Sequence, residues 1–279
     1  MTTIEFDAKT HPGKVRDHNE DNIFASAESQ LWIVADGMGG HACGEVASEI
    51  VVREISRQVP SGHNLVDAIE LSHTAVTDEA AINTRAKGMG ATVVTMQLQG
   101  NQYHIAWVGD SRCYRLRKNK LELLTRDHSY LEWLKDNGIT VEEARRHPKR
   151  NVITQSIGVG EPNPDMVSGE YLAGDRYLLC SDGLNDELTD EEILAILRGA
   201  DNSEVVSEQL VKAALDSGGR DNISVILIDI DPARRPKSSF LVQDALAAIY
   251  NNEDMKKWLP VVCGVLGAAV AAIVIKLVF

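Results

Sequence analysis

Four aspartates in this sequence share one setting, at the end of an apolar segment and beside or near glycine. They are Asp36 after LWIVA, Asp110 after HIAWVG, Asp182 after YLLCS, and Asp221 just before ISVILI. Asp and Gly also form ordinary turns that end strands, so a turn explains any one of these aspartates equally well. Four such positions, together with the acidic stretch RDHNEDN at residues 16–22, favour a functional cluster over four unrelated turns.

The chemistry that such a cluster supports is the binding of divalent cations. Carboxylates gathered in one cleft repel each other unless cations neutralise them, and oxygen-only ligands favour hard ions such as Mg²⁺ or Mn²⁺. Glycine after Asp36 and after Asp182 leaves room for an ion and its waters. Two ions roughly 3.5–4 Å apart can lower the pKa of a shared water and present hydroxide to phosphorus. Arg16 supplies a planar fork that can bind two phosphate oxygens.

The segments that must position these side chains include both strands and helices. Apolar or alternating runs predict strands over 31–35, 92–98, 103–108, 112–117, 176–180 and 223–230, with a hairpin turn at Gly100-Asn101. Helical periodicity covers 44–58, 64–84, 190–197 and 203–215. Hairpins mixed with helices, rather than strict alternation, predict an α+β fold in which helices cover antiparallel sheets.

The composition narrows the function classes. Hydrophobic residues make up 44% and charged residues 25%, as in ordinary globular proteins. The formal net charge of −13 repels nucleic acid backbones, so we expect no nucleic acid partner. The 4 cysteines include no Cys-x-x-Cys pair, which argues against a zinc site or disulfide framework and for a reducing compartment. The N-terminus lacks the apolar run of a secretory signal, so we expect the main domain to stay in the cytosol.

The C-terminal segment departs from this globular pattern. Residues 259–279 carry one charged side chain, Lys276, and as a helix would span ~30 Å, about the hydrocarbon thickness of a bilayer. A buried core helix is the alternative, but such a helix normally has a polar face, and this segment has none. Lys256 and Lys257 before the segment place the large domain on the cytoplasmic side by the positive-inside rule. The sequence therefore predicts a globular domain at 1–231, a linker at 232–257 and a transmembrane helix at 258–279.

Six short motifs, in order, carry a resemblance to a known family. They are RDHNEDN at 16–22, VADGMGGH at 34–41, GATVV at 90–94, VGDSR at 108–112, SDGLND at 181–186 and GRDN at 219–222. In this order they resemble the PPM-type, or protein phosphatase 2C-like, metal-dependent serine/threonine phosphatases in their bacterial form. The resemblance covers about residues 14–230, nearly all of the globular part. It implies a four-layer αββα sandwich, two antiparallel sheets flanked by helices, with the metals at one end.

The resemblance also implies roles for individual residues. Asp36 would bridge two metal ions, with the Gly37 carbonyl on one ion and Asp182 and Asp221 on the other. Glu20 and Asp21 would hold the waters of the metals. A third, weaker metal site would involve Asp110, Asp182 and Asp186, and Arg16 would hold the substrate phosphate. The cofactors implied are two Mn²⁺ or Mg²⁺ ions, with a third ion at the weaker site.

Two features of the chain bear on details of that mechanism. Eukaryotic members carry a histidine directly after the metal-binding Asp-Gly, thought to protonate the leaving hydroxyl, whereas this chain has Met38 there. His41 is a candidate general acid; it could instead cap the following helix or face solvent, and a metal-bound water could serve as the acid. Residues 128–160 resemble the mobile flap beside the active site, although an ordinary helical insertion would look the same.

The function implied is hydrolysis of phosphoserine and phosphothreonine in proteins, on the cytoplasmic face of a membrane, the bacterial inner membrane being expected. The partners would be phosphorylated proteins, substrates of a serine/threonine kinase, and membrane lipid through the C-terminal helix. A catalytically weak pseudophosphatase that binds phosphoproteins is the alternative, and loss of Asp36, Asp182 or Asp221 would favour it; all three are present. A two-metal nuclease is disfavoured by the negative net charge.

Overall fold

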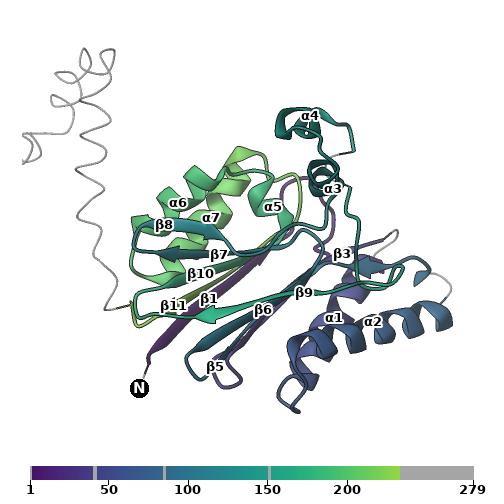
Figure 1. Ribbon diagram of the computed structural model, residues 1–279, viewed down its shortest axis with the longest axis horizontal. Coiled ribbons are helices and arrows are strands. Elements are labelled where there is room, and N and C mark those ends of the chain that lie inside the picture. Colours follow the sequence, from purple (N-terminus) through teal and green to yellow (C-terminus); the bar gives the residue numbers. More distant parts are fainter. Residues whose placement is uncertain (1, 40–42, 84–85, 150–151, 233–279) are drawn as a thin grey trace, which may run out of the picture. The chain divides into compact units, whose positions relative to one another are not determined.

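The computed structural model describes residues 2–39, 43–83, 86–149 and 152–232. These residues form two antiparallel β-sheets that pack face to face, with helices on both outer faces (Figure 1). One sheet has the strand order β1-β11-β10-β7-β8, with bounds β1 Ile4–His11, β7 Arg112–Arg117, β8 Lys120–Leu123, β10 Arg176–Cys180 and β11 Ile223–Ile230. The other has the order β2-β3-β5-β6-β9, with bounds β2 Asp21–Ser26, β3 Leu31–Met38, β5 Val93–Gln99, β6 Gln102–Val108 and β9 Asp165–Glu170. The short strand β4, Gly90–Ala91, pairs with the end of β3.

Helices complete the outer layers. The outer face of the β3 sheet is covered by α1 (Cys43–Gln58) and α2 (Leu65–Ile82) (Figure 1). On the β11 sheet lie α5 (Asp182–Asn185), α6 (Asp190–Gly199) and α7 (Ser203–Ser217). Two further helices, α3 (Tyr130–Asp136) and α4 (Val141–Arg146), stand apart from the layers at one end of the sandwich (Figure 1).

The strand side chains alternate between two cores, as a period of two requires. In β3, Leu31, Ile33 and Ala35 pack toward the α1–α2 layer. Trp32 and Val34 point the other way, into the core between the two sheets. A strand buried on both faces tolerates no slip in register, because a slip of one residue would exchange its two sets of side chains. The position of Asp36 at the end of β3 is fixed in this way.

The sequence predicted most of these elements. All six predicted strands are present, and Gly100, with φ +64°, makes the predicted turn between β5 and β6. The four predicted helices are confirmed within a few residues; α2 begins after Asn64, whose side chain accepts the N–H of Asp67. Strand β7 belongs to the sheet opposite β6, so the chain crosses between sheets within residues 109–111.

Strands β1, β2, β4, β8 and β9 were not predicted. The β1 segment IEFDAKTH does alternate apolar and polar residues, and Ile4, Phe6 and Ala8 pack against the core between the sheets, so this signal was missed. The segments DNIFAS and DMVSGE mix charged or small residues with few apolar ones and carry no such signal.

The αββα sandwich itself is confirmed by the two sheets and their covering helices. Within the part of the chain that the structure describes, no helix is both long and apolar enough to cross a bilayer. The predicted transmembrane helix at 258–279 and residues 233–257 of the linker lie outside the described residues. The predicted domain limits therefore stay predictions.

Candidate active site

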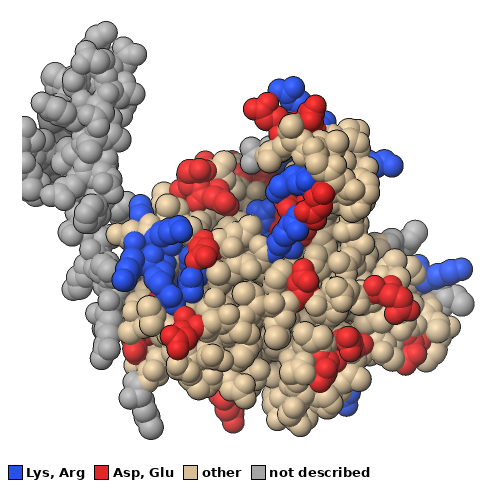
Figure 2. Space-filling model, in the orientation of Figure 1, with Lys and Arg blue, Asp and Glu red and all other residues tan. Residues whose placement is uncertain are grey.

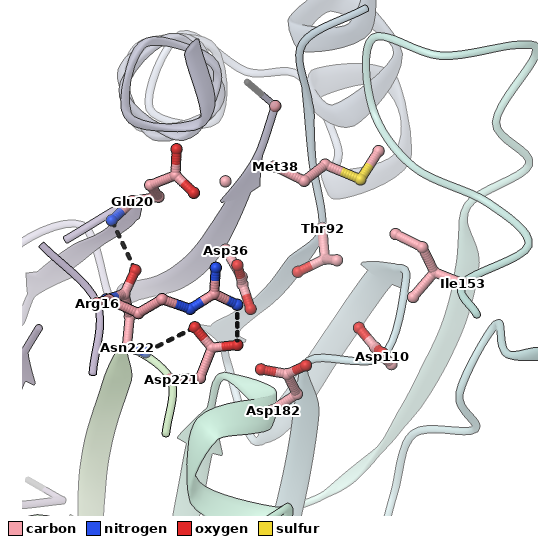
Figure 3. A pocket seen from close by; sticks show the side chains of 12 residues that line it. Arg16, Glu20, Asp36, Met38, Thr92, Asp110, Ile153, Asp182, Asp221 and Asn222 are labelled. Carbon is pink, nitrogen blue, oxygen red and sulfur yellow. Dashed lines mark hydrogen bonds and ion pairs between the residues drawn. The ribbon is translucent and has the colours of Figure 1, made fainter. Parts of the chain in front are cut away.

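The strand-end carboxylates meet in one cleft at an end of the sandwich (Figure 3). Asp36, Asp110, Asp182 and Asp221 all line it. They come from four different strand ends, two in each sheet: β3 and β6 in one, β10 and β11 in the other. The first expectation, that these aspartates form one cluster, is therefore confirmed by their placement.

Backbone pairing places Asp21 directly beside Asp36. Asp21 begins β2 and is the register partner of Asp36 on β3, so the two carboxylates project from neighbouring strands. Asp21 is 7% exposed, and its Oδ2 accepts a hydrogen bond of 2.8 Å from the Ser181 hydroxyl. Burial, opposed by hydrogen bonds from two serines, raises the pKa of Asp21 to about 6. A carboxyl that resists ionisation there would gain from a cation nearby.

The same electrostatic crowding affects the other carboxyls. Burial, followed by the charges of Asp21 and Asp182, raises the pKa of Asp36 well above its usual range. Burial, followed by Asp110 and Asp186, raises the pKa of Asp182 in the same direction. A folded chain that holds several carboxylates so close together favours either bound protons or bound cations at this end.

One observation indicates that the donor set fits divalent cations. One carboxylate oxygen of Asp21 and one of Asp182 are buried, and neither has a hydrogen-bond partner among the described residues. The two unsatisfied carboxylate oxygens are hard oxygen ligands of the kind that Mg²⁺ and Mn²⁺ take. The backbone at Gly37 is packed so tightly that an added Cβ would lie 2.0 Å from the Gly44 carbonyl oxygen. The expectation that glycine after Asp36 and after Asp182 leaves room for an ion is wrong, because backbone carbonyl oxygens fill the space beside both Gly37 and Gly183.

Side chains alone do not complete a coordination shell. Among the described residues, no three Asp, Glu, His or Cys side chains are placed to hold an ion by themselves. An ion in this cleft would therefore need the Gly37 carbonyl and several waters as ligands. That requirement suits Mg²⁺ and Mn²⁺, since Mg²⁺ in particular keeps several waters when it binds to proteins. The predicted roles of Glu20 and Asp21, which were expected to hold the waters of the metals, stay predictions.

Glu20 lies at the cleft beside the start of α1. Its carboxylate accepts a hydrogen bond from the Gly44 backbone, and burial raises its pKa while Arg16 lowers it. Its backbone is fixed on both sides: the N–H donates to Asn222 Oδ1 at 2.8 Å, and the carbonyl accepts from the Ser48 hydroxyl at 2.6 Å. The cleft therefore contains a carboxylate whose residue is held by two other segments, α1 and the residues before β11.

Arg16 is an exposed side chain that reaches over the carboxylates (Figure 3). Its Nη2 lies 2.7 Å from Asp221 Oδ2, and this hydrogen bond raises the pKa of the guanidinium. The other oxygen of Asp221 accepts the Asn222 N–H at 2.9 Å. The predicted phosphate ligand and a predicted metal ligand are thus paired with each other. The structure places Arg16 at the cleft, and its role as the phosphate ligand stays a prediction.

A second cleft adjoins the first and shares Asp110 and Asp182 with it. Asp186, at the end of α5, lines this second cleft together with Asp127. Burial, followed by the charge of Asp127, raises the pKa of Asp110 to about 7. The residues of the predicted third metal site are therefore brought together. Asp127 is an additional carboxylate that sequence reasoning did not include, held by two hydrogen bonds from Arg112 at 2.7 and 2.9 Å.

The remaining predicted features have different outcomes. Met38 lines the cleft at the position where a histidine was noted to be missing, and His41 lies outside the described residues. The segment 128–160 contains α3 and α4 and returns to the cleft at Ile153. Its predicted mobility stays a prediction.

Two residues that hold the site together were missed by sequence reasoning. Asn222 joins its own segment to the connection between β1 and β2: it accepts from the Glu20 N–H and donates to the carbonyl oxygens of Pro12 and His18, both at 2.9 Å. Ser181 donates to Asp21 and accepts the Ser224 N–H at 3.0 Å. Both lie next to a predicted ligand, inside GRDN and SDGLND, and that adjacency is the signal that could have found them.

Comparison with known proteins agrees with this geometry. The family model described as "Protein phosphatase 2C" matches residues 13–216. The serine/threonine protein phosphatase PstP of Mycobacterium tuberculosis is 38% identical over 234 residues, covering 81% of this chain but only 45% of PstP. The serine/threonine phosphatase stp of Listeria welshimeri is 36% identical over 236 residues, covering 79% of this chain and 94% of the relative.

Solved structures show the same likeness. A crystal structure of M. tuberculosis PstP superposes with a TM-score of 0.76 at 36% identity, over 81% of this chain and 98% of that one. A structure of the PstP catalytic domain in complex with two manganese ions gives a TM-score of 0.75 at 34% identity, over 82% of this chain and 99% of that one. The family model spans most of the chain, and the aspartates of the motifs meet in one cleft. This chain therefore belongs to the protein phosphatase 2C family.

Proposed function

We propose that this chain hydrolyses phosphoserine and phosphothreonine esters in proteins, with two Mn²⁺ or Mg²⁺ ions, from a position on the cytoplasmic face of a membrane. The observation that carries the catalytic part is the convergence of Asp36, Asp182 and Asp221 with Arg16 in one cleft. The relatives named as serine/threonine phosphatases, and the PstP structure in complex with two manganese ions, support the same reaction and cofactor.

Some residues of the cleft would bind the cations and others would bind the substrate. Asp36 and the Gly37 carbonyl, with Asp182 and Asp221, would hold the two cations, and Glu20 and Asp21 would orient the waters around them. When bound, such cations lower the pKa of water and neutralise charge that develops on the phosphoryl oxygens.

Arg16 would bind two oxygens of the substrate phosphate and align the phosphorus for attack. Its exposed position at the mouth of the cleft suits a phosphate that arrives on a protein surface loop. The leaving serine or threonine oxygen needs a proton, which Met38 has no group to supply. His41 is the side chain that we propose to test for this role.

The membrane position rests on the sequence of the C-terminal segment. Residues 259–279 are long enough to cross a bilayer and contain one charged side chain, and Lys256 and Lys257 precede them. We propose that this segment anchors the enzyme in the bacterial inner membrane. Phosphorylated proteins, made by a serine/threonine kinase, would be its substrates.

Phosphate release from a phosphothreonine peptide tests the catalytic proposal. We expect release with Mn²⁺ or Mg²⁺, none after a chelator has removed the metal, and recovery when metal is returned. Asp36→Ala should lose the most activity, because this side chain would contact both ions. Full activity in metal-free buffer would refute the mechanism, binding of the peptide without release would favour a pseudophosphatase, and cleavage of nucleic acid instead would favour a nuclease.

A further inference from the structure

Basic side chains gather at the end of the sandwich where the described chain stops. Arg115 and Arg117 lie on β7, Lys118 and Lys120 flank the turn to β8, and Arg198 at the end of α6 donates to the Asn119 carbonyl. Figure 2 shows Lys and Arg gathered over the ends of β7 and β8. We name these five side chains the basic edge. In a chain with a net charge of −13, a local excess of positive charge is unexpected.

The charges of the basic edge are only partly balanced. Arg115 pairs with Glu122 at 2.6 Å, and Arg117 pairs at 2.6 Å with Asp175, which is 1% exposed. Lys118, Lys120 and Arg198 form no ion pair with any described residue. Lys118 and Lys120 are exposed, so they present charge to solvent. The basic edge therefore presents mainly Lys118 and Lys120 to solvent, and the charge of Lys120 is partly offset by the Glu122 carboxylate, whose pKa it lowers after the larger effect of the Arg115 hydrogen bond.

The basic edge lies beside the point from which the chain continues to the C-terminal segment. Leu116 on β7 pairs with Arg176 on β10, which in turn pairs with Asp229 near the end of β11. Adjacent strands lie about 4.8 Å apart, so the end of β7 is roughly 10 Å from the end of β11. The residues that follow, 233–237, add Arg234, Arg235 and Lys237 in sequence.

The active site is at the opposite ends of the same strands. Strand β10 runs from Arg176 at the basic edge to Cys180, two residues before Asp182. Strand β11 runs the other way, from Ile223 near Asp221 to Ile230. An eight-residue strand is about 25 Å long, so contact at the basic edge would leave the catalytic cleft open to the cytosol.

We propose that the basic edge docks on the anionic lipid surface of the membrane and so fixes the orientation of the tethered domain. This rests on the proposed membrane anchor. A flat anionic surface suits the exposed pair Lys118 and Lys120 at this edge, and the anchor would bring them to it. Each Lys or Arg near such a surface strengthens association about fivefold. The negative net charge of the chain favours this one edge over other faces, because excess carboxylates elsewhere are repelled.

Lysine acetylation tests the proposal on the full chain reconstituted in vesicles. We would compare vesicles of phosphatidylcholine with vesicles that also contain phosphatidylserine, and measure the acetylation rate of each lysine by mass spectrometry. We expect acetylation of Lys118 and Lys120 to slow only on the anionic vesicles and to recover in high salt, since salt screens these charges. Exposed Lys87, between α2 and β4, is an internal control whose rate should not change.

A charge-removing variant sharpens the test. In Lys118→Gln, the protection of Lys120 should fall about fivefold, whereas the matched control Lys87→Gln should leave it unchanged. Equal protection on both kinds of vesicle, or none on anionic vesicles, would overturn the docking proposal. So would protection by a soluble acidic peptide but not by anionic vesicles, since that would indicate a protein partner. Flotation with vesicles and phosphate release are measured separately, so failure of the anchor or of the enzyme is distinguishable from failure of docking.

Discussion

Replacing Asp110 with Asn should stabilise the metal-free protein at neutral and alkaline pH. Burial and the charge of Asp127 raise the pKa of Asp110 from an ordinary 3.8 to about 7. One pKa unit corresponds to ~1.4 kcal/mol, so the ionised carboxylate lowers the free energy of unfolding by about 4 kcal/mol. That is a large part of the roughly 5–15 kcal/mol that stabilises a typical domain.

The direction in which the free energy of unfolding changes with pH follows from proton binding. Between about pH 4 and pH 7 the folded protein keeps a proton on Asp110 that the unfolded chain has released. The contribution of Asp110 to the free energy of unfolding of the metal-free protein should therefore be fully present below about pH 4 and fall as the pH rises to about 7. Asp110→Asn cannot ionise, so its free energy of unfolding should exceed that of the unchanged protein by about 4 kcal/mol at pH 8 and by little at pH 4. A further fall should remain, because burial also raises the pKa of Asp21 to about 6 and the pKa values of Asp36 and Asp182 well above their usual range.

Urea denaturation with a chelator present, across this pH range, measures the effect. Asp78→Asn, on an exposed position of α2, is a control that should leave the profile unchanged. Addition of Mn²⁺ should stabilise the unchanged protein most at high pH, where the carboxylates are ionised and available as ligands. Equal stability of Asp110→Asn and the unchanged protein at pH 8 would refute the claim that carboxylate repulsion weakens the metal-free fold.

Three further predictions concern the proposed roles. Arg16→Ala should raise KM for a phosphopeptide about 10- to 100-fold, the value of a charge-assisted bidentate contact; calorimetry should still find both core metals, and loss of metal would show that Arg16 is misassigned. Asp186→Ala should lower turnover yet leave two ions bound, and absence of a core ion from its crystals would disprove a separate third site. Truncation after Asp254 should give a soluble protein with unchanged turnover on aryl phosphates, whereas the full chain should sediment with membranes and resist extraction by salt; release by salt, or loss of turnover on truncation, would mean that the segment is not an anchor.

The sequence predicted the parts of the fold that have a strong periodic pattern. Strand β3 is apolar at five successive positions, and α1 has apolar residues at helical spacing, so both could be found without a structure. Strands such as β9 could not, because DMVSGE forms a strand only by pairing with β6. The assignment of β7 to the sheet opposite β6 could not be predicted either, because the local sequence pattern of a strand does not determine which sheet it joins.

The part of the site that could be predicted consists of residues with a local sequence signal. Asp36 and Asp182 each end an apolar strand beside glycine, which is a local signal. Asn222 has no such signal, because its importance comes from bonds to Glu20, Pro12 and His18, some 200 residues earlier in the chain. The ion pair between Arg16 and Asp221 could not be foreseen either, since it joins side chains that were assigned to different ligands.

That ion pair has a thermodynamic consequence. While Arg16 is bonded to Asp221, its guanidinium partly neutralises the carboxylate as a metal ion would. The same guanidinium nitrogen is then not available to phosphate. A divalent ion that claims Asp221 would release Arg16, so occupancy by metal and affinity for phosphate should rise together. Linkage is reciprocal, so inorganic phosphate should lower the dissociation constant for the metal by the same factor by which metal tightens phosphate binding. Through this ion pair, Arg16 would weaken the binding of phosphorylated proteins to an active site that lacks metal and therefore cannot hydrolyse them.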